Sequence, residues 1–205
     1  MSLVFYYSPM STAVITHWAL EELGIPYEKV KLDIAAGDTK KPDFLKINPN
    51  GAVPVIVHDG TPIFESAAIA IYLGETFGVE KGLFPAAGPA RGQAIAWIVW
   101  ANVSLGGAMN RYTYAASERI PEEQRNAKAA EVARADVERM FGVLDGALAG
   151  KEWLLGDKFS LVDAHVASFT AYANMIGLDT KKWTNLEAWR ARATSRPANV
   201  TAMTP

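Results

Sequence analysis

The sequence changes character once, at a stretch rich in glycine and proline that runs over Glu80–Pro89. Before this stretch, short apolar runs alternate with segments that carry apolar residues at helical spacing, and after it the pattern is helical almost to the end. A chain of 205 residues is long enough for two small domains. We therefore expect an α/β domain over residues 1–80, a linker over 81–90 and an all-helical domain over 91–205.

The first part of the chain predicts the element order β-α-β-α-β-β-α. Because a helical crossover joins the first two strands, they should pair in parallel, whereas the Asp59-Gly60 turn should make the last two strands an antiparallel hairpin. Together these strands predict a mixed sheet covered by helices. The expected strands are Leu3–Tyr7, Tyr27–Leu32, Val53–His58 and Pro62–Phe64, and the expected helices are Ser11–Leu23, Pro42–Ile47 and Glu65–Phe77.

The second part predicts a series of helices. Leu161–Ile176 is apolar on nearly all sides, which is typical of a helix buried in the centre of a domain. Ser160 and Asp163 stand where a capping box would hold the start of this helix, so we expect a structural role for them and no chemistry. The other helices are expected at Arg91–Ala116, Glu122–Leu148 and Leu186–Thr194.

The composition excludes several kinds of site. The formal net charge of −2 gives no electrostatic basis for binding nucleic acid, and the lack of cysteine excludes disulfides, thiolate metal ligands and a protein thiol nucleophile. The histidines His17, His58 and His165 are not spaced as metal ligands. With no apolar run of membrane-spanning length and no signal-peptide pattern, the sequence predicts a soluble cytoplasmic protein that binds neither nucleic acid nor membrane.

The segment Ser8-Pro9-Met10-Ser11-Thr12 joins the first expected strand to the first expected helix. The unpaired N–H groups and the positive dipole end of a helix start favour an anion, and a thiolate is such an anion. A free thiol has a pKa of about 8.5, and a hydroxyl that donates a hydrogen bond to the sulfur favours the charged form. Ser11 or Thr12 could serve in this way, or either could simply cap the helix.

Two further features suit a peptide ligand. Val53-Pro54 follows the Asn48–Gly51 turn, and a cis bond there would turn the Val53 N–H and C=O outward, where a peptide could pair with them. Glu65-Ser66 opens another helix, where Ser66 suits a ligand carboxylate and Glu65 suits a ligand ammonium, as in an α-amino acid group. The alternative for this dipeptide is an ordinary helix cap with an acidic bias.

In their order and spacing, these features resemble a bacterial glutathione S-transferase of the cytosolic superfamily over nearly the whole chain. The resemblance implies a thioredoxin-like N-terminal domain that binds glutathione as co-substrate, a cis Val53–Pro54 bond, no metal, and a homodimer with its sites near the subunit interface. The residues that carry it are Tyr6-Tyr7-Ser8-Pro9 with the Ser/Thr helix start, Asn48 to Val55, Glu65-Ser66-Ala67-Ala68-Ile69 and Ser160 to Ala164.

The beta class of this family places a cysteine close to Ser11 and Thr12, and its absence here removes mixed-disulfide chemistry on the protein. Other classes use a serine or tyrosine near this turn. Counting back along the first helix places the usual serine at Met10 or Ser11, so Ser11 is the expected catalytic hydroxyl, with Thr12 and Ser8 as rivals.

The resemblance also implies where the two substrates bind. Arg111 could hold an acidic or electrophilic substrate, or it could belong to a solvated helix end. Glutathione is expected at Val53, Pro54, Glu65 and Ser66, with Lys41 or its neighbour Lys40 at the glycine carboxylate, and the second substrate at Met10, Asn110, Arg111 and Tyr114.

The expected function is conjugation of the glutathione thiolate to small, mostly hydrophobic electrophiles, a detoxification reaction. The same scaffold could instead carry a glutathione-dependent isomerase, dehalogenase or peroxidase, or a non-catalytic interaction protein. The intact Glu65-Ser66 pair, Val53-Pro54 and Ser11 favour a working glutathione site.

Overall fold

The computed structural model describes residues 2–118 and 120–204, and its N-terminal part is built on a four-stranded sheet. β1 and β2 are parallel, whereas the β1–β3 and β3–β4 pairs are antiparallel. The mixed sheet and the element order β-α-β-α-β-β-α are thereby confirmed. The strands β1 (Leu3–Tyr7), β2 (Glu28–Lys31), β3 (Val55–His58) and β4 (Thr61–Phe64) lie in the order β2-β1-β3-β4.

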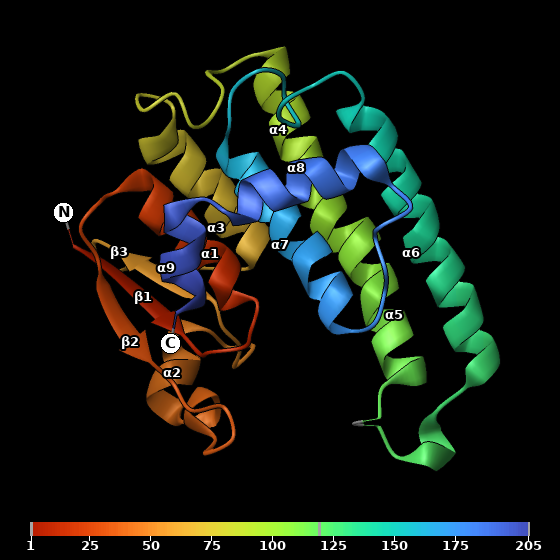
Figure 1. The fold of residues 1–205 in the computed structure, drawn as a ribbon. Helices are drawn as coiled ribbons and strands as arrows, with labels where there is room; N and C mark the ends of the chain where they lie inside the picture. Colours follow the sequence, from red (N-terminus) through yellow and green to blue (C-terminus); the bar gives the residue numbers. More distant parts are fainter. Residues whose placement is uncertain (1, 119, 205) are drawn as a thin grey trace.

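Three α-helices accompany the sheet. They are α1 (Ala13–Leu23), α2 (Pro42–Ile47) and α3 (Ser66–Leu73), and α3 continues through a π-helical turn, η2 (Gly74–Gly78). Figure 1 shows α1 and α3 between the sheet and the helical half of the molecule, with α2 beyond the ends of β1 and β2. This arrangement places the starts of α1 and α3 close to the boundary between the two halves.

The rest of the described chain is helical. One long rod consists of α4 (Pro89–Trp100), a π-helical turn η3 (Ala101–Leu105) and α5 (Gly106–Ala116), and the backbone stays helical at both junctions. The helices α6 (Ala127–Leu148), α7 (Leu161–Met175) and α8 (Thr184–Thr194) follow. The confirmed fold is thus a thioredoxin-like α/β part plus an all-helical part, and the residue limits given for the domains stay a prediction.

Several helix and strand starts lie later than the sequence suggested. β3 begins at Val55, because Pro54 has no N–H to contribute to a strand ladder. The helix predicted from Glu122 begins only at Ala127, because the Asn126 side chain caps it by accepting from the Ala129 N–H at 2.9 Å. The residues before it, Glu122–Gln124, form a separate 3₁₀ turn.

The sequence analysis missed a last helix, α9 (Pro197–Met203). A helix this short is marginal alone and depends on packing for its stability. α9 packs along α1, beside the sheet in Figure 1, and His17 Nδ1 of α1 lies 3.2 Å from the Ala202 carbonyl oxygen. The contact that stabilises α9 is therefore with the other end of the chain.

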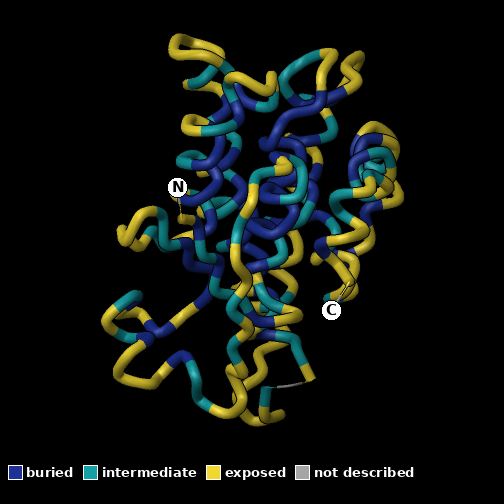
Figure 2. Tube along the Cα trace, turned by 90° about the vertical axis from the view of Figure 1, so that its left-hand side faces the viewer, coloured by how far each residue is buried: buried dark blue, intermediate teal, exposed yellow. Residues whose placement is uncertain are grey.

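The core forms two connected parts, one under the sheet and one among the helices. Figure 2 shows the buried segments gathered along the middle of the molecule and the exposed ones at the loop tips. α7 is buried along most of its length, as its apolar pattern predicted. No helix in the described ranges is long and apolar enough to cross a membrane.

Candidate functional site

The loop between β1 and α1 carries the three hydroxyls proposed for the thiol. Ser11 Oγ donates to the Ser8 carbonyl oxygen at 2.7 Å and accepts from the Ala13 N–H at 3.2 Å. Its only hydrogen is therefore used within the loop. Met10, beside it, has a φ of 55°, a left-handed conformation that is uncommon for a side chain of this size.

Thr12 connects this loop to the second proposed binding segment. Its hydroxyl lies 3.4 Å from the Val53 carbonyl oxygen, at the long end of hydrogen bonding. The Val53–Pro54 peptide bond is cis, as the resemblance implies. The helix start at Ser11-Thr12 and the Val53-Pro54 segment, far apart in the sequence, thus lie next to each other.

The Glu65-Ser66 pair opens α3 in an unusual backbone conformation. Glu65 has a φ of 70° and a ψ of 120°, a region that side chains rarely occupy and that in folded proteins clusters at binding sites. Glu65 is exposed, whereas Ser66 is buried. This conformation leaves the Glu65 carboxylate at the surface directly before the buried start of α3.

The Ser66 hydroxyl has a partner that the sequence analysis missed. Asn102, in the π-helical turn η3, donates from Nδ2 to Ser66 Oγ at 2.9 Å. Asn102 Oδ1 in turn lies 2.6 Å from Nε2 of His165, on α7. Ser66, a proposed binding residue of the α/β part, is therefore connected through Asn102 to the centre of the helical part.

His165 is buried on α7, and only one of its two ring nitrogens has a hydrogen-bond partner in the described chain. Its Nε2 is bonded to Asn102, but its Nδ1 is buried without a hydrogen-bond partner in the described chain. Burial lowers the pKa of the His165 imidazole to about 3, so the ring is neutral.

The two lysines proposed for the glycine carboxylate have other partners. Lys40 Nζ donates to the Gly51 carbonyl oxygen at 3.0 Å and so ties down the turn before Val53. Lys41 Nζ lies 2.6 Å from Asp38 Oδ1, and this carboxylate raises the pKa of Lys41. The Lys41 side chain is 66% exposed, so a ligand could still reach it.

The residues proposed for the second substrate, Met10, Asn110, Arg111 and Tyr114, are all exposed at the surface. Met10 is 81% exposed and Tyr114 is 70% exposed, and Asn110 is also at the surface. Arg111 Nη2 pairs with Asp136 Oδ2 at 3.0 Å, which directs its guanidinium toward α6. Their role stays a prediction.

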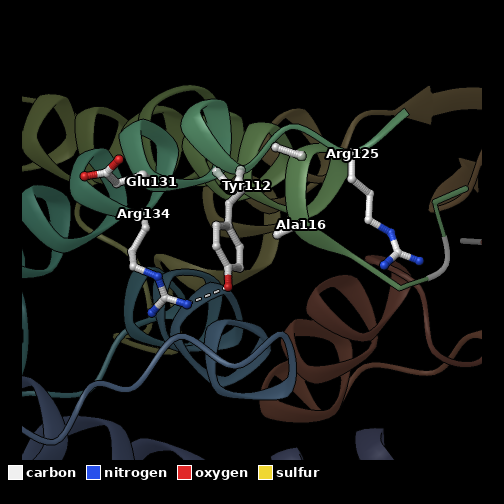
Figure 3. Close-up of a pocket in the computed structure, with 8 residues that line it drawn as sticks. Tyr112, Ala116, Arg125, Glu131 and Arg134 are labelled. Carbon is white, nitrogen blue, oxygen red and sulfur yellow. Dashed lines mark hydrogen bonds between the residues drawn. The ribbon is translucent and has the colours of Figure 1, made fainter. Parts of the chain in front are cut away.

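A cavity of about 470 Å³ does lie beside the end of α5, where the sequence analysis had no signal for it. Figure 3 shows Arg134 and Arg125 on opposite sides of Tyr112. Arg134 Nη2 donates to the Tyr112 hydroxyl at 2.6 Å. The lining residues are Tyr112, Ala115, Ala116, Arg125, Ala127, Ala130, Glu131 and Arg134.

Ser160 and Asp163 form a capping box at the start of α7. Asp163 Oδ2 accepts from both the N–H and the hydroxyl of Ser160, each at 2.9 Å. Its other oxygen accepts from the Leu154 N–H and from Trp189 Nε1, each at 2.8 Å. The carboxylate is fully buried and joins three segments, which is a structural role.

Among residues 2–118 and 120–204, no group of three or more acidic or histidine side chains is arranged to hold a metal ion. The site is therefore built from hydroxyls, backbone groups, an amide and a carboxylate. Such groups suit a ligand that carries its own reactive atom.

Comparison with known proteins places these features in a family. Residues 1–75 match the family description of the glutathione S-transferase N-terminal domain, and residues 108–197 match that of the C-terminal domain. Glutathione S-transferase GstB of Escherichia coli is 34% identical over 181 residues, which cover 87% of this chain and 86% of that protein. The disulfide-bond oxidoreductase YfcG of Escherichia coli is 29% identical over 97% of this chain and 93% of its own length.

The fold agrees with this assignment. A glutathione transferase from Burkholderia graminis, crystallised with two glutathione molecules bound per subunit, superposes with a TM-score of 0.88 at 28% identity and covers all of this chain and 88% of its own. Both domain families are matched, and GstB is matched over most of both chains. The chain therefore belongs to the glutathione S-transferase family.

Proposed function

We propose that the chain binds glutathione at the edge formed by Thr12, Val53 and Ser66 and transfers its thiolate to small, hydrophobic electrophiles. The observation that carries the proposal is the contact of the α1 start with the Val53–Pro54 segment, on a helix that also packs against α3. The Thr12–Val53 contact brings these two segments together. Ser66 then offers a hydroxyl, and the exposed Glu65 a carboxylate, for the α-amino acid end of the peptide.

The protein lowers the pKa of the bound thiol, and the ligand supplies the sulfur. The thiol gives up its proton to solvent, and the sulfur then forms a bond to the electrophilic carbon while a leaving group departs or a conjugated double bond opens. A helix start favours the thiolate, and a donated hydroxyl hydrogen favours it further. Ser11 can donate only after its hydrogen leaves the Ser8 carbonyl, whereas Thr12 has only the long contact to Val53 to give up.

The electrophile is proposed to bind between the β1–α1 loop and α5, near Met10, Asn110 and Tyr114. The alanine-lined cavity lies farther along the same helix. Arg134, at this cavity, supplies a cation that Arg111 does not, since Arg111 is paired with Asp136. An electrophile with an apolar body and a negative charge would match this composition.

We further propose a homodimer. Val99, Val103 and Tyr114 on the α4–η3–α5 rod are 42%, 69% and 70% exposed, so this rod offers apolar side chains that a partner could cover. A second copy packed against this side of the rod would bury them near α3 and the glutathione site.

A second candidate activity is reduction of disulfides by two glutathione molecules. It is favoured by the relative YfcG, named a disulfide-bond oxidoreductase, and by the Burkholderia graminis structure with two glutathione molecules. One glutathione thiolate would attack the disulfide and release one substrate thiolate, and the second would attack the mixed disulfide, release the other substrate thiolate and yield glutathione disulfide. This route needs no cysteine in the protein, and the chain has none.

Calorimetric titration with glutathione tests the binding site. Ser66→Ala and Glu65→Ala should each weaken binding, by about 1–3 kcal/mol for Ser66. Ser168→Ala is the matched control, since the Ser168 hydroxyl bonds only within α7. If both Ser66→Ala and Glu65→Ala bound glutathione as tightly as the parent, the proposed glutathione site would be wrong. A panel of an aryl chloride, an unsaturated ketone and a dialkyl disulfide then separates the two activities.

A further inference from the structure

A row of three polar side chains crosses from the α/β part into the centre of the helical part. It runs from Ser66 at the start of α3, through Asn102 in η3, to His165 on α7. The Asn102–Ser66 contact is 2.9 Å long and the His165–Asn102 contact is 2.6 Å long, so both are within hydrogen-bond distance. Ser66 and His165 are buried, so water does not compete strongly for either end.

The direction of the hydrogen bonds along this row can be deduced. The amide of Asn102 has one donating end and one accepting end, so His165 and Ser66 must play opposite parts. Either His165 Nε2–H donates to Asn102 Oδ1 and Asn102 donates to Ser66, or both bonds run the other way. In the second case His165 Nδ1 would carry a hydrogen.

The unpartnered Nδ1 of His165 distinguishes these alternatives. This atom is buried and has no hydrogen-bond partner in the described chain. A buried N–H without an acceptor is rarer in proteins than an acceptor left without a donor. Nδ1 is therefore the bare nitrogen and Nε2 carries the hydrogen, because the burial that lowers the pKa of this imidazole keeps the ring neutral. Ser66 Oγ consequently accepts from Asn102, and its own hydrogen is free.

We propose that His165 is a positioning residue which, through Asn102, makes the Ser66 hydroxyl a hydrogen-bond donor to the carboxylate of the bound peptide. This inference rests on the proposed glutathione site. A carboxylate can only accept hydrogen bonds. If the Ser66 hydroxyl donated its hydrogen to Asn102, it would present only lone pairs to the ligand carboxylate and would repel it. The polarity set at His165 therefore decides whether Ser66 attracts or repels the ligand.

Packing alone gives no reason for a histidine at this position. Its ring packs against the Phe169 ring, with 5.6 Å between centroids, a contact that an apolar side chain could also make. Its unpartnered Nδ1 destabilises the fold, since a buried polar atom without a partner is unfavourable. The bond to Asn102 is the one polar contact that the described structure gives this side chain.

Glutathione affinity, measured by calorimetry, tests the proposal. His165→Leu should weaken binding about tenfold, the size expected for a lost hydrogen bond to a charged group. His165→Gln, whose amide N–H can donate to Asn102, should recover most of that loss. Asn102→Asp offers only acceptors to Ser66 and should weaken binding at least as much as Ser66→Ala. His17→Leu removes a buried histidine outside the row and should leave the affinity unchanged.

The Ser66→Ala background separates positioning from general damage to the fold. If His165 acts through Ser66, adding His165→Leu to Ser66→Ala should produce no further loss of affinity. A further tenfold loss in that background, or parental affinity in a folded His165→Leu variant, would overturn the proposal and leave the proposed glutathione site standing. A parent chain that does not bind glutathione would instead overturn the proposed function, and this inference with it.

Discussion

The guanidinium of Arg196 donates two hydrogen bonds to the carboxylate of Glu22, one of 2.6 Å from Nε to Oε1 and one of 2.7 Å from Nη2 to Oε2. Glu22 lies in the last turn of α1, whereas Arg196 immediately precedes α9. The Glu22 side chain is only 6% exposed and also accepts from Trp18 Nε1 at 3.0 Å. The carboxylate therefore depends on Arg196 for its neutralisation.

Arg196→Met should lower the free energy of unfolding by about 2–3 kcal/mol, because it leaves the buried Glu22 carboxylate without its cation. This is below the full value for a buried pair, since Arg196 itself is 32% exposed. Urea unfolding measures the change. Arg139→Met, which removes an ion pair of a side chain 63% exposed, is the control and should change stability by less than about 0.5 kcal/mol. Equal effects of the two variants would contradict a special role for the Arg196–Glu22 pair.

Stability should fall on mild acidification, partly because of His165. Its folded-state pKa is lowered to about 3, so below pH of about 6.5 the unfolded chain binds a proton that the folded chain does not. The contribution is fully present above that pH and is lost as the pH falls toward the folded pKa. Between pH 7.5 and 5.5 it amounts to about 1.4 kcal/mol. The loss in the parent should exceed that in His165→Leu by this amount in urea unfolding at both pH values. If the stabilities of the parent and His165→Leu depended on pH in the same way, the pKa of His165 would not be lowered in the folded state.

Asp163→Ala should harm folding more than catalysis. The substitution leaves the Ser160 N–H, the Leu154 N–H and Trp189 Nε1 without their common acceptor. We expect a loss of about 3 kcal/mol or more in the free energy of unfolding, and turnover close to that of the parent while the protein is folded. Thermal unfolding beside activity measures both quantities. A fully stable but inactive variant would assign Asp163 to the chemistry.

The hydroxyl that stabilises the thiolate should be identified by the pH dependence of turnover. If Ser11 donates to the sulfur, Ser11→Ala should raise the pKa of bound glutathione and slow turnover about ten- to a hundredfold near neutral pH, with affinity changed less. Thiolate absorbance on the bound complex measures the pKa directly. Thr12→Val and Ser8→Ala are the comparisons. A shift in Thr12→Val alone would give the role to Thr12, and no shift in any variant would give it to backbone N–H groups.

Val103→Glu should dissociate the proposed homodimer. A charge buried in an apolar interface without a partner is strongly unfavourable, and Val103 is 69% exposed on the rod. Light scattering at micromolar concentration should give twice the mass of the chain for the parent and a single chain for the variant. Val132→Glu, at a site 56% exposed on α6, is the matched control and should remain dimeric. A parent of single-chain mass would contradict the dimer.

What the sequence could predict depended on how far apart the interacting residues are. The Asp59-Gly60 hairpin and the capping box of Ser160 and Asp163 join residues only a few positions apart, so the local pattern was enough for both. The Ser66–Asn102 and Asn102–His165 contacts join residues 36 and 63 positions apart. Nothing near Asn102 in the sequence indicates either partner.

Long sequence separation also explains why α9 was not predicted and why the sequence alone left Ser11, Thr12 and Ser8 as alternatives for the thiol. α9 is stabilised by contacts with α1 across 174 to 185 positions, and its own sequence carries no strong periodicity. At the β1–α1 loop, the sequence placed Ser11 and Thr12 at the helix start but could not show how their hydrogens are used. That depends on the Ser8 and Val53 carbonyls, which only the folded chain brings within reach.

The contacts of α1 bear on how the protein unfolds. This helix follows the first strand, yet it packs against α7 and α9 as well as α3, and its side chains are buried on nearly every side. Removing the helical half would uncover one side of α1 and expose Trp18, which packs in the core of that half, to water. We therefore expect the two parts of the chain to unfold in one cooperative transition, in which the first helix and the last lose their structure together and the β1–α1 loop loses its order with them.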